Sequence, residues 1–161
     1  MRSLIALAWT IAFLASSALC NPTNAPGSFS AEAGFDAISA ALSRGEVGRV
    51  ELLRVPPNLE TRAAITPEAL ERIYYTKLVI RNIAEMPLRR QMIEALKSTS
   101  IHPRDYIADV RWGLIFYSRE DVRIGAIYFD RSGRNGAVND AGATFHGRLF
   151  NWMETTFSAC P

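Results

Sequence analysis

The stretch from residue 109 to residue 140 constrains the fold of this chain more than any other part of the sequence, which there reads DVRWGLIFYSREDVRIGAIYFDRSGRNGAVND. Two long, largely apolar runs are separated by a polar turn, and a second turn leads to a third, short run. This pattern predicts three consecutive antiparallel strands, with the short strand 136–139 at the edge of the sheet. We therefore expect this stretch to form the centre of the sheet.

The alternation of side chains within the first run predicts which face of the sheet each one occupies. Trp112, Leu114 and Phe116 should share one face, and Arg111, Gly113, Ile115 and Tyr117 the other. The second run, 122–129, is apolar on both faces. A strand of that kind is usually covered on both sides, or is central in the sheet with an interface on one side.

The rest of the chain predicts two more strands, at 47–55 and 75–83, and four helices. The first helix should begin at an N-cap residue, Ser30, and end at Gly45. The second should begin at Thr66–Pro67 and the third at Pro87, and the last should span 147–158. Residues 98–106 are predicted to be a loop. The order αβαβα–βββ–α predicts an α+β domain, in which helices pack on a mainly antiparallel sheet of about five strands.

The first 20 residues have the three parts of a secretory signal peptide. One basic residue, Arg2, precedes an apolar run from Leu4 to Leu14 and then a region of small residues. Residues 21–29 are rich in Pro, Asn and Gly and should form a flexible linker, so that one domain occupies 30–161. The apolar run is shorter than a bilayer-spanning helix, so we expect a soluble, exported protein, periplasmic or secreted, with no transmembrane segment in the mature chain.

The chain has two cysteines, Cys20 and Cys160, which stand at the two ends of the predicted mature chain. Cleavage after Ala18 would keep Cys20 in the mature chain, and in an oxidising compartment the two cysteines could then form a disulfide that closes nearly the whole domain. Two alternatives remain open: cleavage after Cys20 would remove it with the signal peptide, and lipidation of Cys20 would anchor the protein to a membrane. Leu19 disfavours lipidation, because lipoprotein signals favour a small residue there.

Composition excludes several classes of function. The formal net charge of +2 falls to +1 when Arg2 leaves with the signal peptide, which argues against a nucleic-acid-binding protein. The only two histidines, His102 and His146, are far apart in sequence, so no metal site is predicted. A hydrolase triad of Ser132, His146 and Asp130 lacks any supporting motif, and no cofactor-binding motif is found.

The polar residues of the central stretch are the candidate site. Asp109, Arg111 and Asp130 are expected to form a cross-strand ion pair. The alternative is a recognition patch made of Arg111, Tyr117, Tyr128 and Asp130, which Tyr74–Tyr75 could extend, because Arg and Tyr are favoured at binding hot spots. Core and ladder packing would explain the tyrosines equally well.

The segments VELLRVP, ITPEALERIYY, RWGLIFY, IYFDRSGRNGAVN and FNWMETTFSAC resemble those of small, exported, uncharacterised proteobacterial proteins. The resemblance covers most of the predicted mature chain and includes a cysteine after the last helix, which would give Cys160 a structural role. That family has no assigned activity, so the resemblance implies no catalytic residues.

Our leading hypothesis from the sequence is a non-enzymatic binding module of the periplasm or cell envelope, whose partner is a protein or an envelope component. The alternatives are a small periplasmic hydrolase that uses carboxylates such as Asp109 and Asp130, and a lipid-anchored envelope protein.

Overall fold

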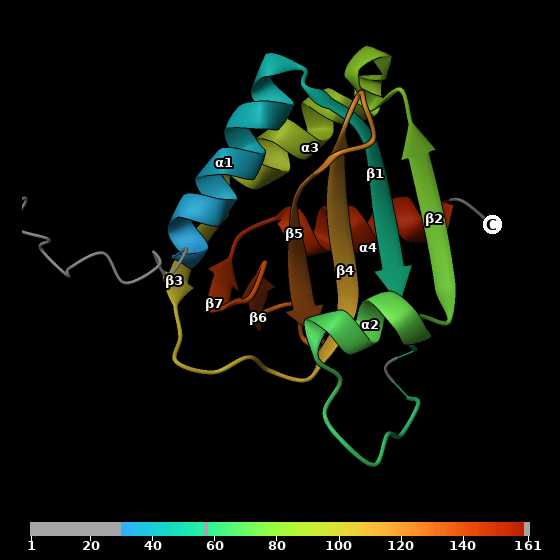
Figure 1. Ribbon diagram of the computed structural model, residues 1–161, viewed down its shortest axis with the longest axis vertical. Coiled ribbons are helices and arrows are strands. Elements are labelled where there is room, and N and C mark those ends of the chain that lie inside the picture. The colour runs from blue at the N-terminus through green and yellow to red at the C-terminus, as the bar shows by residue number, and fades with distance from the viewer. Residues whose placement is uncertain (1–29, 57, 160–161) are drawn as a thin grey trace, which may run out of the picture.

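The computed structural model describes residues 30–56 and 58–159. The predicted signal peptide, the linker and both cysteines lie outside these ranges. The described chain is an α+β domain with one seven-stranded sheet (Figure 1). Its elements, in chain order, are α1 (Ala31–Arg44), β1 (Val47–Arg54), α2 (Pro67–Ile73), β2 (Thr76–Arg81), the 3-10 turn η1 (Ile83–Glu85), α3 (Pro87–Lys97), β3 (Ser100–Pro103), β4 (Val110–Ser118), β5 (Arg123–Asp130), β6 (Asn135–Val138), β7 (Ala141–His146) and α4 (Leu149–Ala159).

The strands follow the order β2-β1-β4-β5-β6-β7-β3, and every neighbouring pair is antiparallel. Four consecutive strands, β4 to β7, form a meander in the middle. The strands β1 and β2 extend the sheet on one side of this meander, and β3 extends it on the other. The predicted central position of the stretch 109–140 is therefore confirmed.

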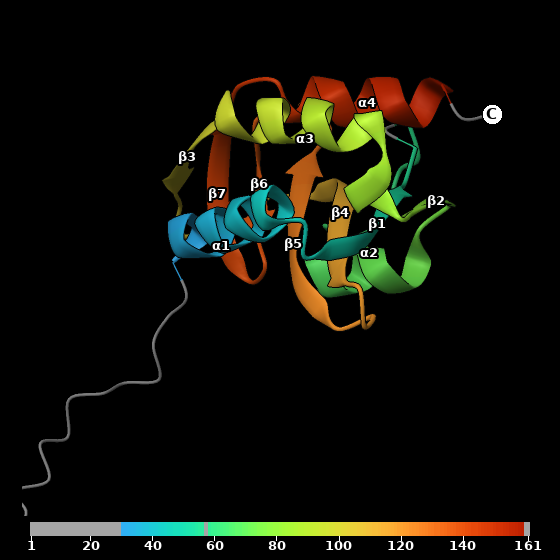
Figure 2. The ribbon, with the colours of Figure 1, turned by 90° about the horizontal axis from the view of Figure 1, so that it is seen from above.

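Helices cover the two faces of the sheet unequally. Figure 2 shows α3 and α4 on one side of the strands and α2 on the other. The helix α1 also packs on the α3–α4 side, because Phe35, Ile38 and Leu42 belong to the same buried cluster as the α3 and α4 residues. The opposite face is covered only in part, by α2 and the segment that precedes it.

The main core forms between the three helices and the sheet. Trp112, Leu114 and Phe116 of β4 enter it together, as the alternation predicts. They meet Met92 of α3 and Met153 of α4, and all five side chains are at most 2% exposed. Full burial of each large apolar side chain stabilises the fold by roughly 1.5–3 kcal/mol, so this layer dominates the stability of the domain.

A second, smaller core lies on the other face, beneath α2. Leu70 of α2 packs there with Ile115 of β4 and Tyr128 of β5. The strand β5 is thus buried on both faces, as its apolar sequence predicts. Residue 113 of β4 is a glycine, which lets the Leu70 side chain approach the strand closely. A Cβ at Gly113 would lie only 3.3 Å from that side chain.

The helix signals in the sequence are confirmed. The Ser30 hydroxyl accepts a hydrogen bond from the Ala33 backbone N–H at 3.1 Å, and Gly45 ends α1 in a left-handed conformation. Thr66 caps α2 in the same way, with Pro67 at its first turn. Pro87 begins α3, which ends at Lys97. The last helix begins at Leu149, two residues later than predicted.

The predicted number of strands, about five, is too low. The segment 98–106 was expected to be a loop, but it contains β3, and β7 follows the strand that was expected to be the edge. The strand β6 is therefore internal, paired with β5 and β7. The sequence signal is weak in both missed strands: β3 reads SIHP, and β7 begins with the small residues of AGAT. The strand β3 is specified by its pairing with β7, a partner distant in sequence, which propensity alone does not show.

Within the described residues, none of the helices has both the length and the apolar composition needed to cross a membrane.

Candidate functional site

The structure places Arg111 inside the protein, only 4% exposed. Its Nη2 lies 2.7 Å from Oδ2 of Asp109, and its Nη1 donates to the Leu59 carbonyl at 2.8 Å. A further hydrogen bond reaches Thr61, and Asp109 also accepts from the backbone N–H of Ile65. The pair thus fastens the segment before α2 to β4, and Arg111 has little surface to offer a partner.

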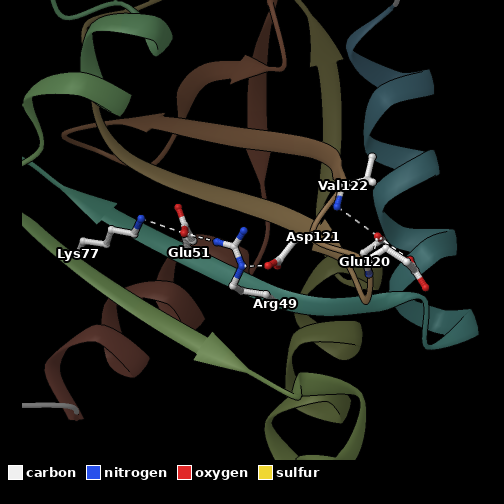
Figure 3. A network of polar contacts seen from close by, with 7 residues as sticks. Arg49, Glu51, Lys77, Glu120, Asp121 and Val122 are labelled. Carbon is white, nitrogen blue, oxygen red and sulfur yellow. Dashed lines mark hydrogen bonds and ion pairs between the residues drawn. The ribbon is translucent and has the colours of Figure 1, made fainter.

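Tyr117 lies half-buried under another arginine. The guanidinium of Arg49 stacks on its ring, 3.7 Å from the centroid. Arg49 also donates to Asp121 at 2.8 Å and pairs with the buried carboxylate of Glu51, which Lys77 meets at 2.8 Å from the other side (Figure 3). The hydrogen bond from Arg49 lowers the pKa of Asp121. Tyr117 is therefore part of a packed polar network that joins β1, β2 and the β4–β5 turn.

Asp130 organises the turn that follows β5. Its Oδ1 accepts hydrogen bonds from the backbone N–H groups of Ser132, Arg134 and Asn135, at 3.0 to 3.3 Å. The expected ion pair of Asp109, Arg111 and Asp130 is wrong in part: Arg111 bonds to Asp109, and Asp130 is committed to its turn. Ser132 donates to Asp130, but the His146 ring lies against that of His102, so no catalytic triad is assembled.

Of the four predicted binding residues, Tyr128 lines a large groove on the partly covered face. We call this the α2 groove. Its volume is about 1340 Å³. It lies between α2, the segment 103–107 that begins at the last residue of β3, the start of β5 and the turn between β6 and β7.

A hydrogen-bonded group forms the floor of the α2 groove. The buried Tyr128 hydroxyl bonds to Glu71 of α2, and Arg123 donates to that hydroxyl at 2.8 Å and to the Glu71 carboxylate at 2.9 Å. Burial, with the Glu71 hydrogen bond, raises the pKa of Tyr128. The three groups satisfy one another's hydrogen bonds and hold α2 on the sheet, and Arg123 neutralises the charge of Glu71.

The wall formed by the segment 103–107 has a different character. The guanidinium of Arg104 stacks on the ring of Tyr106 at 4.1 Å and hydrogen-bonds to the Tyr106 hydroxyl and to the Asn135 side chain. Both acceptors are neutral, and no carboxylate among the described residues lies within 4.0 Å of Arg104. Tyr106 and Ile107 are 57% and 37% exposed. This wall thus presents an arginine without an ion pair beside exposed apolar surface.

Sequence reasoning missed the residues that give the groove its chemistry: Glu71, Arg104, Tyr106 and Arg123. An arginine and a tyrosine two residues apart are the composition expected of a binding surface. Arg104 and Tyr106 carry that signal, but they lie in the segment 98–106, which was predicted only as a loop. Glu71 and Arg123 could not be linked by sequence, since 52 positions separate them.

The described residues contain no group of three or more His, Cys, Asp or Glu side chains placed to hold a metal ion. The chain matches no known protein family, and comparisons with curated proteins and with solved structures find no match. The fold and site therefore define the class only as an α+β domain with a single antiparallel sheet and a groove on its less covered face.

Proposed function

We propose that the chain is an exported, non-enzymatic binding module, and that the α2 groove takes an extended, carboxylate-bearing segment of a partner protein. The observation that carries the proposal is the Arg104–Tyr106 pair: a stacked guanidinium with neutral hydrogen-bond partners, on the wall of a large groove. Export remains an inference from the first 20 residues of the sequence.

The state of Arg104 supports a carboxylate as the group that is recognised. A guanidinium binds a carboxylate through two parallel hydrogen bonds, and such charge-assisted bonds are about twice as strong as neutral ones. The other two arginines that line the groove, Arg72 and Arg123, are already paired with Glu68 and Glu71. A negative charge of the partner would therefore contribute most binding free energy at Arg104.

The acidic residues of the groove argue against a polyanion as the partner. Asp105 and Asp140 also line it, and neither has a cationic partner within 4.0 Å among the described residues. A nucleic acid or a heavily phosphorylated ligand would be repelled by them. A peptide with a single carboxylate could pair that group with Arg104 and bring no further negative charge close to Asp105 and Asp140.

The size and the apolar surface of the groove favour a chain segment over a small molecule. Pockets for small ligands measure about 300–1,000 Å³ and enclose most of the ligand. The α2 groove is larger and is bordered by the exposed side chains of Tyr106 and Ile107. These surfaces suit the side chains that flank the carboxylate in a peptide.

Selection from a displayed peptide library against the purified protein tests the proposal. We expect the enriched peptides to share one acidic side chain or a free C-terminal carboxylate, and Arg104→Ala to weaken their binding at least tenfold. Arg90→Ala is the matched control, because Arg90 is exposed on α3, on the other side of the sheet. Peptides without a carboxylate, or equal loss in both variants, would refute the proposed groove.

The hydrolase hypothesis gains no support from the geometry. Asp109 and Asp130 bind backbone N–H groups and neighbouring side chains, and neither lines the α2 groove.

Mass spectrometry of the mature protein, with and without reductant, tests the expectations about the N-terminus and the cysteines. A Leu19 start supports cleavage after Ala18, and an acylated Cys20 supports the lipid anchor. A mass gain of 2 Da on reduction, roughly the two hydrogens of one disulfide, supports the Cys20–Cys160 bond.

A further inference from the structure

We propose that His102 and His146 form a surface site for a divalent transition-metal ion, and that Cu²⁺ is the ion it binds most tightly. The two residues are 44 positions apart, yet the pairing of β3 with β7 brings their rings to a centroid separation of 5.8 Å. They are also the only histidines of the chain.

The register of the two strands explains the approach. Ser100 stands opposite His146 and His102 opposite Thr144, so the two histidines are diagonal neighbours on one face. Diagonal neighbours on antiparallel strands are within reach of aromatic side chains. The intervening pair, Ile101 and Phe145, points to the other face and packs in the main core.

The separation suits a shared metal ion. Zinc, a close analogue in size, binds imidazole nitrogens at about 2.0–2.1 Å, which places two ligating ring centroids roughly 5–6.5 Å apart, depending on the angle at the metal. The observed 5.8 Å lies within that range. Both side chains are exposed, so small rotations that aim a nitrogen at the ion meet little resistance.

The backbone that carries the two rings is held firmly. Phe145, which precedes His146, is 4% exposed and packs against Phe129 in a tilted arrangement, with the ring centroids 4.6 Å apart. The Thr144 hydroxyl hydrogen-bonds to the His102 carbonyl at 3.4 Å, and the Ser100 hydroxyl to the His146 carbonyl at 3.4 Å. The spacing of the two Cα atoms is therefore fixed before any ion binds, which lowers the entropic cost of chelation.

The ligand set decides the class of ion. Imidazole suits Zn, Cu, Fe and Ni, and affinity for a given nitrogen site is highest for Cu²⁺ in the divalent series. A structural zinc site requires four protein ligands. Among the described residues no third His, Cys, Asp or Glu completes this pair, so water would fill the other positions. The site would therefore be open, and the bound ion accessible from solvent.

The test uses the full-length protein with Cys20→Ser and Cys160→Ser, so that no cysteine thiolate competes for the ion or reduces it. Pulsed electron paramagnetic resonance with one equivalent of Cu²⁺ reports imidazole coordination directly, and with two histidines in the chain any such signal comes from this pair. We expect two coordinated imidazoles, and at least a tenfold loss of affinity in His102→Ala and in His146→Ala.

Thermal unfolding gives a second readout, because an ion that bridges β3 and β7 binds only the folded state and stabilises it. We expect Cu²⁺ to raise the unfolding midpoint of the parent protein and to leave that of each alanine variant unchanged. A spectrum without imidazole nitrogens, one coordinated imidazole, or equal affinity in the parent and in either variant would overturn the proposal. His102 and His146 do not line the α2 groove, so the site stands or falls independently of the proposed peptide binding.

Discussion

Nη2 of Arg111 lies 2.7 Å from Oδ2 of Asp109, two residues earlier in the chain, beneath a segment that both residues bind. The arginine holds the Leu59 carbonyl, and the aspartate holds the Ile65 backbone N–H. Together they fix the course of the chain from β1 to α2 and hence the position of one wall of the α2 groove.

Replacement of Arg111 by alanine should destabilise the fold by about 2–3 kcal/mol. Removal of one partner from a buried pair leaves the other charge without its counter-ion, which typically costs 3–5 kcal/mol, and the partial exposure of Asp109 reduces that value. Urea unfolding measures the change. The control variant Arg90→Ala should differ from the native protein by less than about 0.5 kcal/mol. A loss below about 1 kcal/mol in Arg111→Ala would show that the segment is held by other contacts.

Tyr128 should make the stability of the domain fall at alkaline pH. Its pKa is raised in the folded protein, by burial first and then by the Glu71 hydrogen bond. The unfolded chain, with a tyrosine pKa of about 10, therefore loses this proton first. Above that pH the folded state binds more protons than the unfolded state, so the free energy of unfolding decreases as the pH rises.

In urea unfolding between pH 9 and 11, Tyr128→Phe should flatten this decline, because its ring has no ionisable group. At pH 7 the same variant should lose roughly 1 kcal/mol, from the missing hydrogen bonds to Glu71 and Arg123. Tyr75→Phe is the control, since Tyr75 is 76% exposed. If Tyr128→Phe and the native protein decline in parallel, Tyr128 is not the group responsible.

Gly142→Ala should disturb the groove wall and lower stability by about 1–3 kcal/mol through overpacking. A Cβ at Gly142 would lie 2.3 Å from the Tyr106 carbonyl oxygen and 2.7 Å from that of Arg104, both of them backbone atoms. The segment 104–106 would have to move away from β7. Gly113→Ala makes a suitable comparison: its closest neighbours, at 3.3 to 3.4 Å, are side-chain atoms of Leu70 and Tyr128 that can adjust. Equal unfolding midpoints for the two variants would contradict this account.

The contact of Arg49 with Tyr117 should depend on the planar guanidinium, because lysine does not stack on a ring in the same way. We expect Arg49→Lys to lose about 1 kcal/mol of stability. A double-mutant cycle with Tyr117→Leu isolates the stacking from the ion pairs to Glu51 and Asp121. A coupling energy near zero would mean that the ion pairs alone hold Arg49 in place.

Sequence reasoning succeeded where a structural signal lies within a few residues. The alternation of Trp112, Leu114 and Phe116 correctly separated the two faces of β4. Ser30 and Gly45 correctly marked the ends of α1, because capping is decided by the local backbone. The apolar character of β5 on both faces correctly indicated that it is covered on both sides.

It failed where the partner of a segment is distant. Nothing local in SIHP indicates a strand, because β3 exists through its pairing with β7. Arg111 has the residue type of a binding hot spot, but the segment that carries Leu59 and Thr61, 52 and 50 positions earlier, covers it. The candidate site could not be predicted for the same reason. Glu71, Arg104 and Arg123 lie in three separate segments of the chain, and only the tertiary fold brings them together.

The strand order also has a consequence for the order in which the protein folds. The strands β4 to β7 are joined by short turns, whereas β1 must find β4 across about 60 residues and β3 must find β7 across about 40. Closing the shorter loops costs less chain entropy, so we expect the meander to form early and the flanking strands to join it later. The walls of the α2 groove come from α2 and from the chain that leaves β3. We therefore expect these two walls to fold last and to exchange their amide hydrogens first. The groove would then open while the centre of the sheet stays folded.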